Sequence, residues 1–253
     1  MSRAAPAELR LVALRGLPAV QPGDDLAAQV AAAARAQGLA LANGVLVVAQ
    51  KVVSKAEGRV VRLADVEPSA EARRIAAQDG KDPRHVEVVL RETARVVRHA
   101  RGVWIAETRH GFVCANAGVD LSNAPEADVA VLLPLDPDAS ARRLREALVA
   151  AGGGPLAVIV SDTFGRPWRE GLVDVALGSA GLAPVTDWRG RRDLAGRPLE
   201  VTAMAQVDQL AAAAGLLMGK DAGVPAVWIE GLAPAGDGAV RELLRDPAAD
   251  LFR

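Results

Sequence analysis

The chain has 253 residues, enough to bury a large core in one domain or in two modest subdomains. Its 30 Lys and Arg residues against 31 Asp and Glu residues give a net charge of -1, which argues against a nucleic-acid or anionic-membrane partner. The single cysteine, Cys114, excludes an internal disulfide. Nothing resembles an export signal or an apolar run of about 18 residues, so we expect a soluble, cytoplasmic protein.

Alternating strand and helix patterns predict an α/β (α+β) fold, in which a mixed sheet is flanked by helices. Short apolar runs predict strands at Leu9–Leu14, Gly44–Ala49, Val103–Thr108, Phe112–Ala115, Val129–Leu133, Leu156–Val160 and Ala226–Glu230. Capped segments with helical periodicity predict helices at Leu26–Ala36, Ala70–Ala77, Pro83–Val97, Ala141–Ala150 and Gln206–Met218, with a short one at Gly238–Leu244. His85 and His99 fall in the Arg-rich predicted helices, which indicates surface positions.

The densest group of polar residues follows the apolar run Leu156–Val160. Asp162 and Thr163 supply hard oxygen ligands suited to Mg²⁺ or Mn²⁺. Arg166 and Arg169 supply planar cations that match phosphate or carboxylate oxygens. A capped strand end followed by a turn and solvated arginines is the simpler interpretation. The crowding of these residue types favours a site.

Two further segments can bear a binding site or belong to solvated loops. Lys51 and Lys55 follow the strand Gly44–Ala49 and offer two ammonium groups to a polyphosphate, although the segment also fits a solvated loop. Asp120 and Asn123 are spaced so that both can approach one ion if the chain turns, and they equally fit an Asx-turn.

Two segments nearer the C-terminus carry the same ambiguity. The arginine-rich segment Asp187–Arg197 is either a solvated loop or a binding loop for an anionic substrate. Gly178 and Gly181 allow close packing or the approach of a ligand.

Common nucleotide and hydrolase motifs are missing from the sequence, and no paired Cys or His has metal-ligand spacing. Three scattered His residues argue against a zinc site or a His-driven triad. We therefore expect chemistry based on carboxylates, arginines, lysines and a hard metal ion.

Several segments, taken together and in order, resemble the coenzyme F420-0:L-glutamate ligase (F420 gamma-glutamyl ligase) family over about residues 10–245. They are Gly16-Leu-Pro18, Pro22-Gly-Asp-Asp25, Val53-Ser-Lys-Ala-Glu-Gly-Arg59, Asn116-Ala-Gly-Val-Asp120, Ser161-Asp-Thr163 with Gly165-Arg166, and Leu217-Met-Gly219. The resemblance implies the fold of that family in a single domain, residues 1–253, which can divide into two subdomains. No flavin reductase domain, which two-domain bacterial relatives append, is expected.

The resemblance also implies an activity and its partners. Members add glutamate through a γ-glutamyl link to the deazaflavin cofactor F420. The expected substrates are GTP, F420-0 and L-glutamate, and the expected assembly is a homodimer. Two divalent ions, Mg²⁺ or Mn²⁺, and a monovalent cation, K⁺, are implied as cofactors.

By motif position the resemblance assigns roles to particular residues. The implied metal ligands are Asp120, Asp162 and Thr163, with Asp221 as a candidate fourth. The expected catalytic cations are Lys55 together with Arg166 and Arg169, which are chosen because they follow the metal motif. The implied nucleotide contacts are Leu17, Pro18, Ala19, Val20, Gln50, Lys51, Lys55, Asn123, Met218, Gly219, Lys220, Asp221, Ala222, Gly223 and Val224. Archaeal members place an acidic metal ligand directly after Leu-Met-Gly, where this chain has Lys220. Asp221 or a water is the expected substitute.

The implied reaction needs no protein nucleophile. GTP would phosphorylate the carboxylate of F420-0, and the glutamate amine would attack the acyl phosphate, so that positioning and charge neutralisation suffice. A metal-dependent phosphatase or nucleotidase would use the same residues, and a non-catalytic GTP-binding regulator would bind without turnover.

Overall fold

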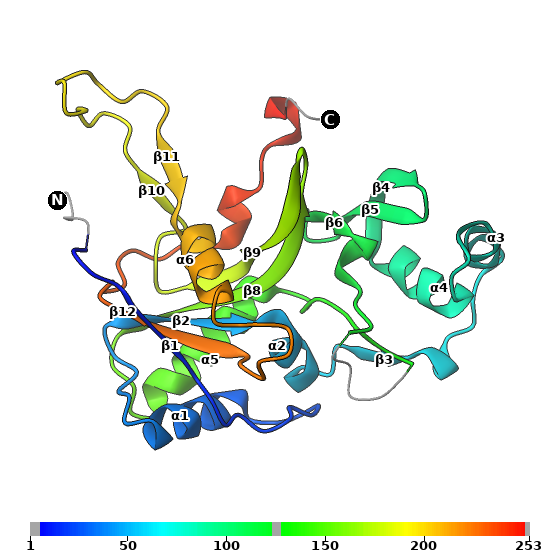
Figure 1. The fold of residues 1–253 in the computed structure, drawn as a ribbon, viewed down its shortest axis with the longest axis horizontal. Helices are drawn as coiled ribbons and strands as arrows, with labels where there is room; N and C mark the ends of the chain where they lie inside the picture. Colours follow the sequence, from blue (N-terminus) through cyan, green and yellow to red (C-terminus); the bar gives the residue numbers. More distant parts are fainter. Residues whose placement is uncertain (1–5, 123–127, 251–253) are drawn as a thin grey trace.

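A computed structural model of the chain describes residues 6–122 and 128–250. Its central element is a mixed five-stranded sheet with the order β1-β12-β2-β8-β9. The strands are β1 (Arg10–Ala13), β12 (Ala226–Glu230), β2 (Gly44–Ala49), β8 (Leu156–Arg166) and β9 (Arg169–Ala180). Only the β2–β8 pair in this sheet is parallel, and the other neighbours are antiparallel. The predicted mixed sheet with flanking helices is confirmed (Figure 1).

The two faces of this sheet are covered by different helices. Leu46 and Val48 of β2 face a core shared with α1 (Leu26–Ala36), α2 (Gln50–Ala56) and α5 (Pro137–Ala150). Val45 and Val47 face the opposite way, into a core shared with α6 (Gln206–Gly215). This alternation is the period-two pattern of a strand buried on both sides. It explains why β2 is a continuous apolar run.

A second region packs around its own core beside the main sheet (Figure 1). It contains α3 (Ala70–Asp79), α4 (Pro83–Glu92), the sheet β4-β5-β6 and the pair β3-β7. The strands are β4 (Thr93–Ala100), β5 (Val103–Thr108), β6 (Val113–Ala115), β3 (Val60–Arg62) and β7 (Val129–Val131), with the 3-10 turns η1 (Leu63–Asp65) and η2 (Asn116–Gly118). The predicted strands Val103–Thr108 and Phe112–Ala115 are found as the antiparallel pair β5–β6, although β6 starts one residue later than predicted.

The predicted helix Pro83–Val97 is wrong beyond Glu92, because Thr93 begins β4, which pairs with β5. The β-branched residues Val96 and Val97 prefer a strand, and cross-strand pairing overrides the helical periodicity. His99 therefore lies on a strand, with a ring nitrogen 2.7 Å from an Asp79 oxygen and only 21% of its side chain exposed. Burial also lowers the pKa of His85 on α4, so neither histidine is a fully solvated surface residue.

The segment that carries Lys51 and Lys55 is not the solvated loop that one interpretation predicted. It is helical, because α2 starts directly after β2. The strand predicted to stop at Val160 runs on to Arg166 and forms a long hairpin with β9. Asp162 and Thr163 therefore lie within a strand pair instead of at a strand end. Cross-strand hydrogen bonds hold this polar segment extended.

Smaller differences concern the ends of elements. The predicted helix Gln206–Met218 ends at Gly215, and Gly238–Leu244 contains only the 3-10 turn η3 (Val240–Leu243). Helix α5 starts at Pro137 because the Asp136 side chain accepts a hydrogen bond from Ala139 N at 2.9 Å. A last 3-10 turn is η4 (Pro247–Ala249).

Gly178 serves packing. A Cβ there would overlap the Pro137 carbonyl, so its absence lets α5 approach β9 closely. Gly181 has φ +80, and a Cβ there would meet the Arg145 side chain. Both positions therefore belong to the α5–β9 interface, where close packing was one of the two predicted uses.

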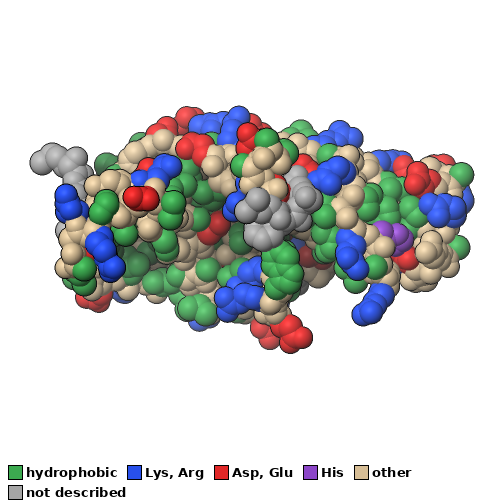
Figure 2. All heavy atoms as spheres, turned by 90° about the horizontal axis from the view of Figure 1, so that it is seen from above, with side chains coloured by type: hydrophobic (Ala, Val, Ile, Leu, Met, Phe, Trp, Pro, Cys, Tyr) green, Lys and Arg blue, Asp and Glu red, His purple; other side chains and the backbone are tan. Residues whose placement is uncertain are grey.

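A narrow extension, which we call the arm (residues 185–205), projects from the main sheet region (Figure 1). It consists of β10 (Val185–Asp187), β11 (Ala203–Ala205) and the loop between them. Basic and acidic side chains are interspersed over the face shown in Figure 2, as the balanced composition predicts. In the described ranges, no helix combines the length and apolar composition needed to cross a membrane.

Candidate functional site

Four chain segments meet at one end of the main sheet because of its strand directions. Ala49 of β2 lies opposite Ser161 of the parallel strand β8, so the chain leaves both strands at the same end of the sheet. Strand β12 runs antiparallel to β2, with Ala226 opposite Val48, so the segment preceding β12 arrives there. Strand β1 is antiparallel to β12, and the segment following β1 leaves from the same place.

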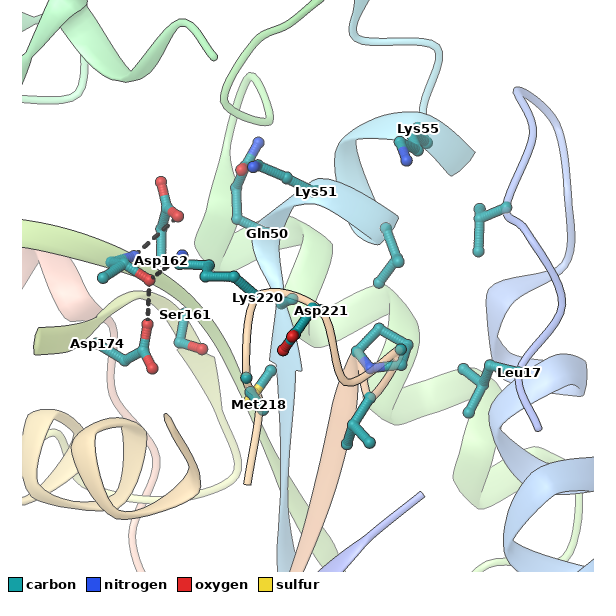
Figure 3. Close-up of a pocket in the computed structure, with 18 of the residues that line it drawn as sticks. Leu17, Gln50, Lys51, Lys55, Ser161, Asp162, Asp174, Met218, Lys220 and Asp221 are labelled. Atoms are coloured by element: carbon teal, nitrogen blue, oxygen red, sulfur yellow. Dashed lines mark hydrogen bonds between the residues drawn. The ribbon is translucent and has the colours of Figure 1, made fainter. Parts of the chain in front are cut away.

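These segments enclose a cavity of about 410 Å³ (Figure 3). Its lining is Leu17, Pro18, Ala19, Val20, Ala49, Gln50, Lys51, Val52, Lys55, Ser161, Asp162, Thr163, Asp174, Met218, Gly219, Lys220, Asp221, Gly223, Val224 and Pro225. The structure thus brings together nearly all the residues that the family resemblance assigns to nucleotide contact. Ala222 belongs to the same turn but not to the lining, and Asn123 lies outside the described residues.

Lys51 connects the cavity to the second region. Its Nζ lies 2.7 Å from Asp120 Oδ2 and donates to Ser122 Oγ at 2.7 Å and to Ser122 O at 3.1 Å. Asp120 does not itself line the cavity; it is placed beside the cavity through this pair. Burial raises the pKa of Asp120, but the hydrogen bonds from Lys51 and Ser122 outweigh it and hold the pKa below its usual value. The carboxylate is therefore ionised beside an ammonium group.

Asp162 is the carboxylate whose pKa is most displaced around the cavity. Burial raises its pKa to about 6, against the opposing effects of the Thr163 N–H, Lys51 and Lys220. Its Oδ1 accepts from Thr163 N at 2.8 Å. A partly desolvated carboxylate of this kind gains more from a bound cation than a solvated one does.

Thr163 stands between a cation and an anion. Lys220 Nζ donates to Thr163 Oγ1 at 2.7 Å, and Thr163 Oγ1 donates to Asp174 Oδ1 at 2.6 Å (Figure 3). No sequence pattern identified Asp174, which lies on β9 opposite Thr163. A simple two-residue turn at Pro167-Trp168 would pair Thr163 with Leu172, and only the register shift between Phe164 and Arg166 brings Asp174 opposite.

Gln50 and Lys55 line the cavity from α2. Both amide hydrogens of Gln50 are used inside the protein, since its Nε2 donates to Ser54 Oγ at 2.6 Å and to Leu132 O at 2.8 Å. Burial, and then the nearby Lys51, lower the pKa of Lys55. Figure 3 shows Lys55 and Leu17 across the cavity from Lys220 and Asp162.

Arg166 and Arg169 lie elsewhere. They face each other at the exposed tip of the β8–β9 hairpin, and neither lines the cavity. In the arm, Arg189 pairs with Asp187 at 2.7 Å and Arg197 with Asp193 at 3.1 Å, while Arg191 lies 4.6 Å over the Trp188 ring. The arm arginines thus have partners close to them in sequence, as the solvated-loop interpretation predicts.

The cavity offers oxygen ligands for a hard cation, although they are few. Asp162 supplies a half-buried carboxylate, and Asp120 lies beside the cavity through its pair with Lys51. Asp221 lines the cavity next to Lys220 (Figure 3). Among the residues that the structure describes, no three His, Cys, Asp or Glu side chains converge on one point. Phosphate or water oxygens would therefore have to complete the coordination, as they usually do for Mg²⁺.

Fold and cavity together define an α/β protein with a site suited to a small polyanion and its cation, because three lysines and three aspartates line a cavity at the end of a sheet. The F420-0:Gamma-glutamyl ligase family matches residues 16–231, and the chain belongs to that family. Its recognition from the sequence is confirmed.

The named relatives match over nearly the full length of both chains. A protein of Methanothermobacter thermautotrophicus, named coenzyme F420:L-glutamate ligase, is 49% identical over 97% of this chain and 99% of its own length. Proteins with the same name from Methanopyrus kandleri and Archaeoglobus fulgidus are 48% and 42% identical over 92% and 95% of this chain, and over 93% and 94% of their own lengths.

Proposed function

We propose that this protein joins L-glutamate to coenzyme F420-0 in the biosynthesis of coenzyme F420, with GTP as phosphoryl donor. Membership of the family and the names of relatives up to 49% identical support the ligase activity. The choice of GTP and the acyl-phosphate route rest on the resemblance and on the charges around the cavity. A homodimer and a requirement for K⁺ belong to the same proposal.

The arrangement of charge around the cavity is the observation that carries the proposal. Lys51, Lys55 and Lys220 reach the cavity from α2 and from the segment before β12. Asp162 lies close enough to Lys51 and Lys220 for both to act on its pKa. Phosphoryl transfer needs positioned cations around the phosphates more than it needs a nucleophile on the protein.

In the proposed reaction a carboxylate oxygen of F420-0 attacks the γ-phosphorus of GTP. The bond from that phosphorus to the β–γ bridging oxygen breaks, and GDP leaves. The glutamate amine then attacks the acyl carbon, the carbon–oxygen bond to phosphate breaks, and inorganic phosphate and a proton are released. Lys51, Lys55 and Lys220 hold the phosphates. Asp120 and Asp162 would hold a divalent cation, which would supply further charge neutralisation when bound.

Incubation of the purified protein with GTP, Mn²⁺, F420-0 and glutamate tests the proposal by mass spectrometry. We expect a product heavier than F420-0 by one glutamyl unit, with GDP formed in equal amount. Omission of F420-0 is the control that separates the alternatives. Phosphate release from GTP without F420-0 would indicate a nucleotidase, and GTP binding without any turnover would indicate a regulator.

A further inference from the structure

The Lys220 ammonium group lies at the place where the resemblance puts a metal ligand. Its Nζ is 2.7 Å from Thr163 Oγ1, and Thr163 directs its own proton to Asp174 at 2.6 Å. The three groups form a chain from cation through hydroxyl to anion, and each hydrogen bond orients the next. The Thr163 hydroxyl oxygen thus already accepts a hydrogen bond from a cation of the protein itself.

The anion at the other end of this chain is held in a space that admits no side chain. A Cβ at position 215 would overlap Asp174 Oδ2, so Gly215 at the end of α6 leaves room for the carboxylate. Packing against this backbone directs the other oxygen, Oδ1, to Thr163. Lys220 therefore has a counter-charge that is fixed by α6 and β9, independently of any ligand.

Lys220 is exposed, but an ammonium group and a divalent cation within a few ångströms of each other repel even near a protein surface. Lys220 also acts on Asp162, whose neighbour Thr163 it contacts. Asp120 is also paired with an ammonium group, Lys51, but Ser122 Oγ and Ser122 O accept hydrogen bonds from that group as well, so Lys51 keeps two protein partners when Asp120 binds a cation. Phosphate oxygens near Thr163 would meet an ammonium group there, which has three N–H donors and gives one of them to Thr163.

We propose that Lys220 is a built-in cation of this site, which takes the place of one divalent ion. The protein then binds one divalent ion per chain, at Asp162 and Asp120, where the resemblance implies two. This inference rests on the proposed function for the identity of the phosphate ligand. The number of ions, however, is a property of the protein that can be measured without turnover.

The decisive measurement is the number of Mn²⁺ ions bound per chain, by equilibrium dialysis of the full chain with the β,γ-imido analogue of GTP. Free nucleotide in the outer compartment corrects for Mn²⁺ bound to the analogue alone. We expect one ion for the wild type and two for Lys220→Gln, which removes the charge but keeps a polar side chain of similar length. Circular dichroism verifies that the variant is folded.

Lys81→Gln is the matched control, because Lys81 lies between α3 and α4 and is not part of the cavity lining. It makes the same change in net charge, and we expect it to bind one ion. Two ions on the wild type, or one on Lys220→Gln, would overturn the inference. Two ions on Lys81→Gln would do so as well, since net charge would then explain the count. Absence of ligation together with the expected counts would instead contradict only the proposed function.

Discussion

The cavity and the arm both contain many charged residues, but different physical effects control those charges. Around the cavity burial is the largest cause, and it raises the pKa of Asp162 to about 6 and that of nearby Cys114 to about 12. In the arm the hydrogen bond from Arg189 is the largest cause, and it lowers the pKa of Asp187 to about 2. Desolvation is thus the largest cause of the pKa shifts in the first region and a smaller one in the second.

The partners also differ in how far apart they are in the sequence. Lys51 bonds Ser122, 71 residues away, and Lys220 bonds Thr163, 57 residues away. In the arm, Arg189 and Arg197 bond aspartates two and four residues away. Charges that are neutralised by sequence neighbours need no fold to hold them, whereas the cavity charges exist as a group only because the sheet assembles them.

The largest expected effect tests whether burial controls the pKa values of the groups around the cavity. With its pKa near 12, the Cys114 thiol is almost entirely protonated at pH 8. We expect alkylation by iodoacetamide in EDTA to be about a thousandfold slower in the native protein than in urea, because only the thiolate reacts. Equal rates in the two conditions would show that the region is open to solvent.

The next effect compares matched carboxylates in the two regions. Asp162→Asn and Asp120→Asn should each reduce ligation about a hundredfold, since loss of charge stabilisation of this kind costs about 3 kcal/mol in the barrier. Asp193→Asn makes the same change in the arm, and we expect turnover within about twofold of wild type because exposed pairs contribute little. Turnover near the wild-type value in Asp162→Asn at saturating Mn²⁺ would contradict the site.

A smaller effect is expected at the tip of the β8–β9 hairpin. Arg169 is exposed there, so its loss should cost at most about 1 kcal/mol, or about fivefold in kcat/KM for GTP. The measurement is steady-state kinetics of Arg169→Ala, with Arg98→Ala on the exposed strand β4 as control. A loss as large as that in Asp162→Asn would show that the tip closes over the nucleotide during catalysis.

The smallest effect is expected in the arm itself. The Arg197–Asp193 pair has 79% and 30% of its side chains exposed, so Arg197→Gln should change the free energy of unfolding by no more than about 1 kcal/mol. For a chain of this size that corresponds to a shift in Tm of at most about 4 °C, measurable by calorimetry. A larger shift would mean that the arm contributes to global stability.

Local sequence patterns predicted much of the fold. Strand Gly44–Ala49 and helix Leu26–Ala36 are found with the predicted bounds, because an apolar run and an Asp25 cap act on their own neighbours. The segment Thr93 to Val97 fits a helical pattern locally, but it forms a strand. A local pattern misses this because the pairing with β5 depends on residues elsewhere in the chain. The resemblance identified most of the cavity lining, which no periodicity could have shown.

Two parts of the site could not have been read from the sequence. Asp174 comes opposite Thr163 only through an irregularity in the β8–β9 register, and nothing in the local composition specifies that irregularity. Arg166 and Arg169 are exposed because the β8–β9 hairpin is long. Strand β8 continues to Arg166, six residues beyond the predicted end at Val160. Both depend on pairing between segments and not on the residues themselves.

The parallel register of β2 and β8, with Ala49 opposite Ser161, also has a consequence for how this chain can change in length. Successive side chains of a strand point to opposite faces, so one residue inserted between Leu156 and Ser161 would exchange every later side chain between the two faces. The segment would then present Ser161 and Thr163 where Asp162 now lies. Insertions in the loop of the arm would move no cavity residue. We therefore expect length variation among functional homologues to be confined to segments such as the arm, while the spacing from Leu156 to Asp162 stays constant.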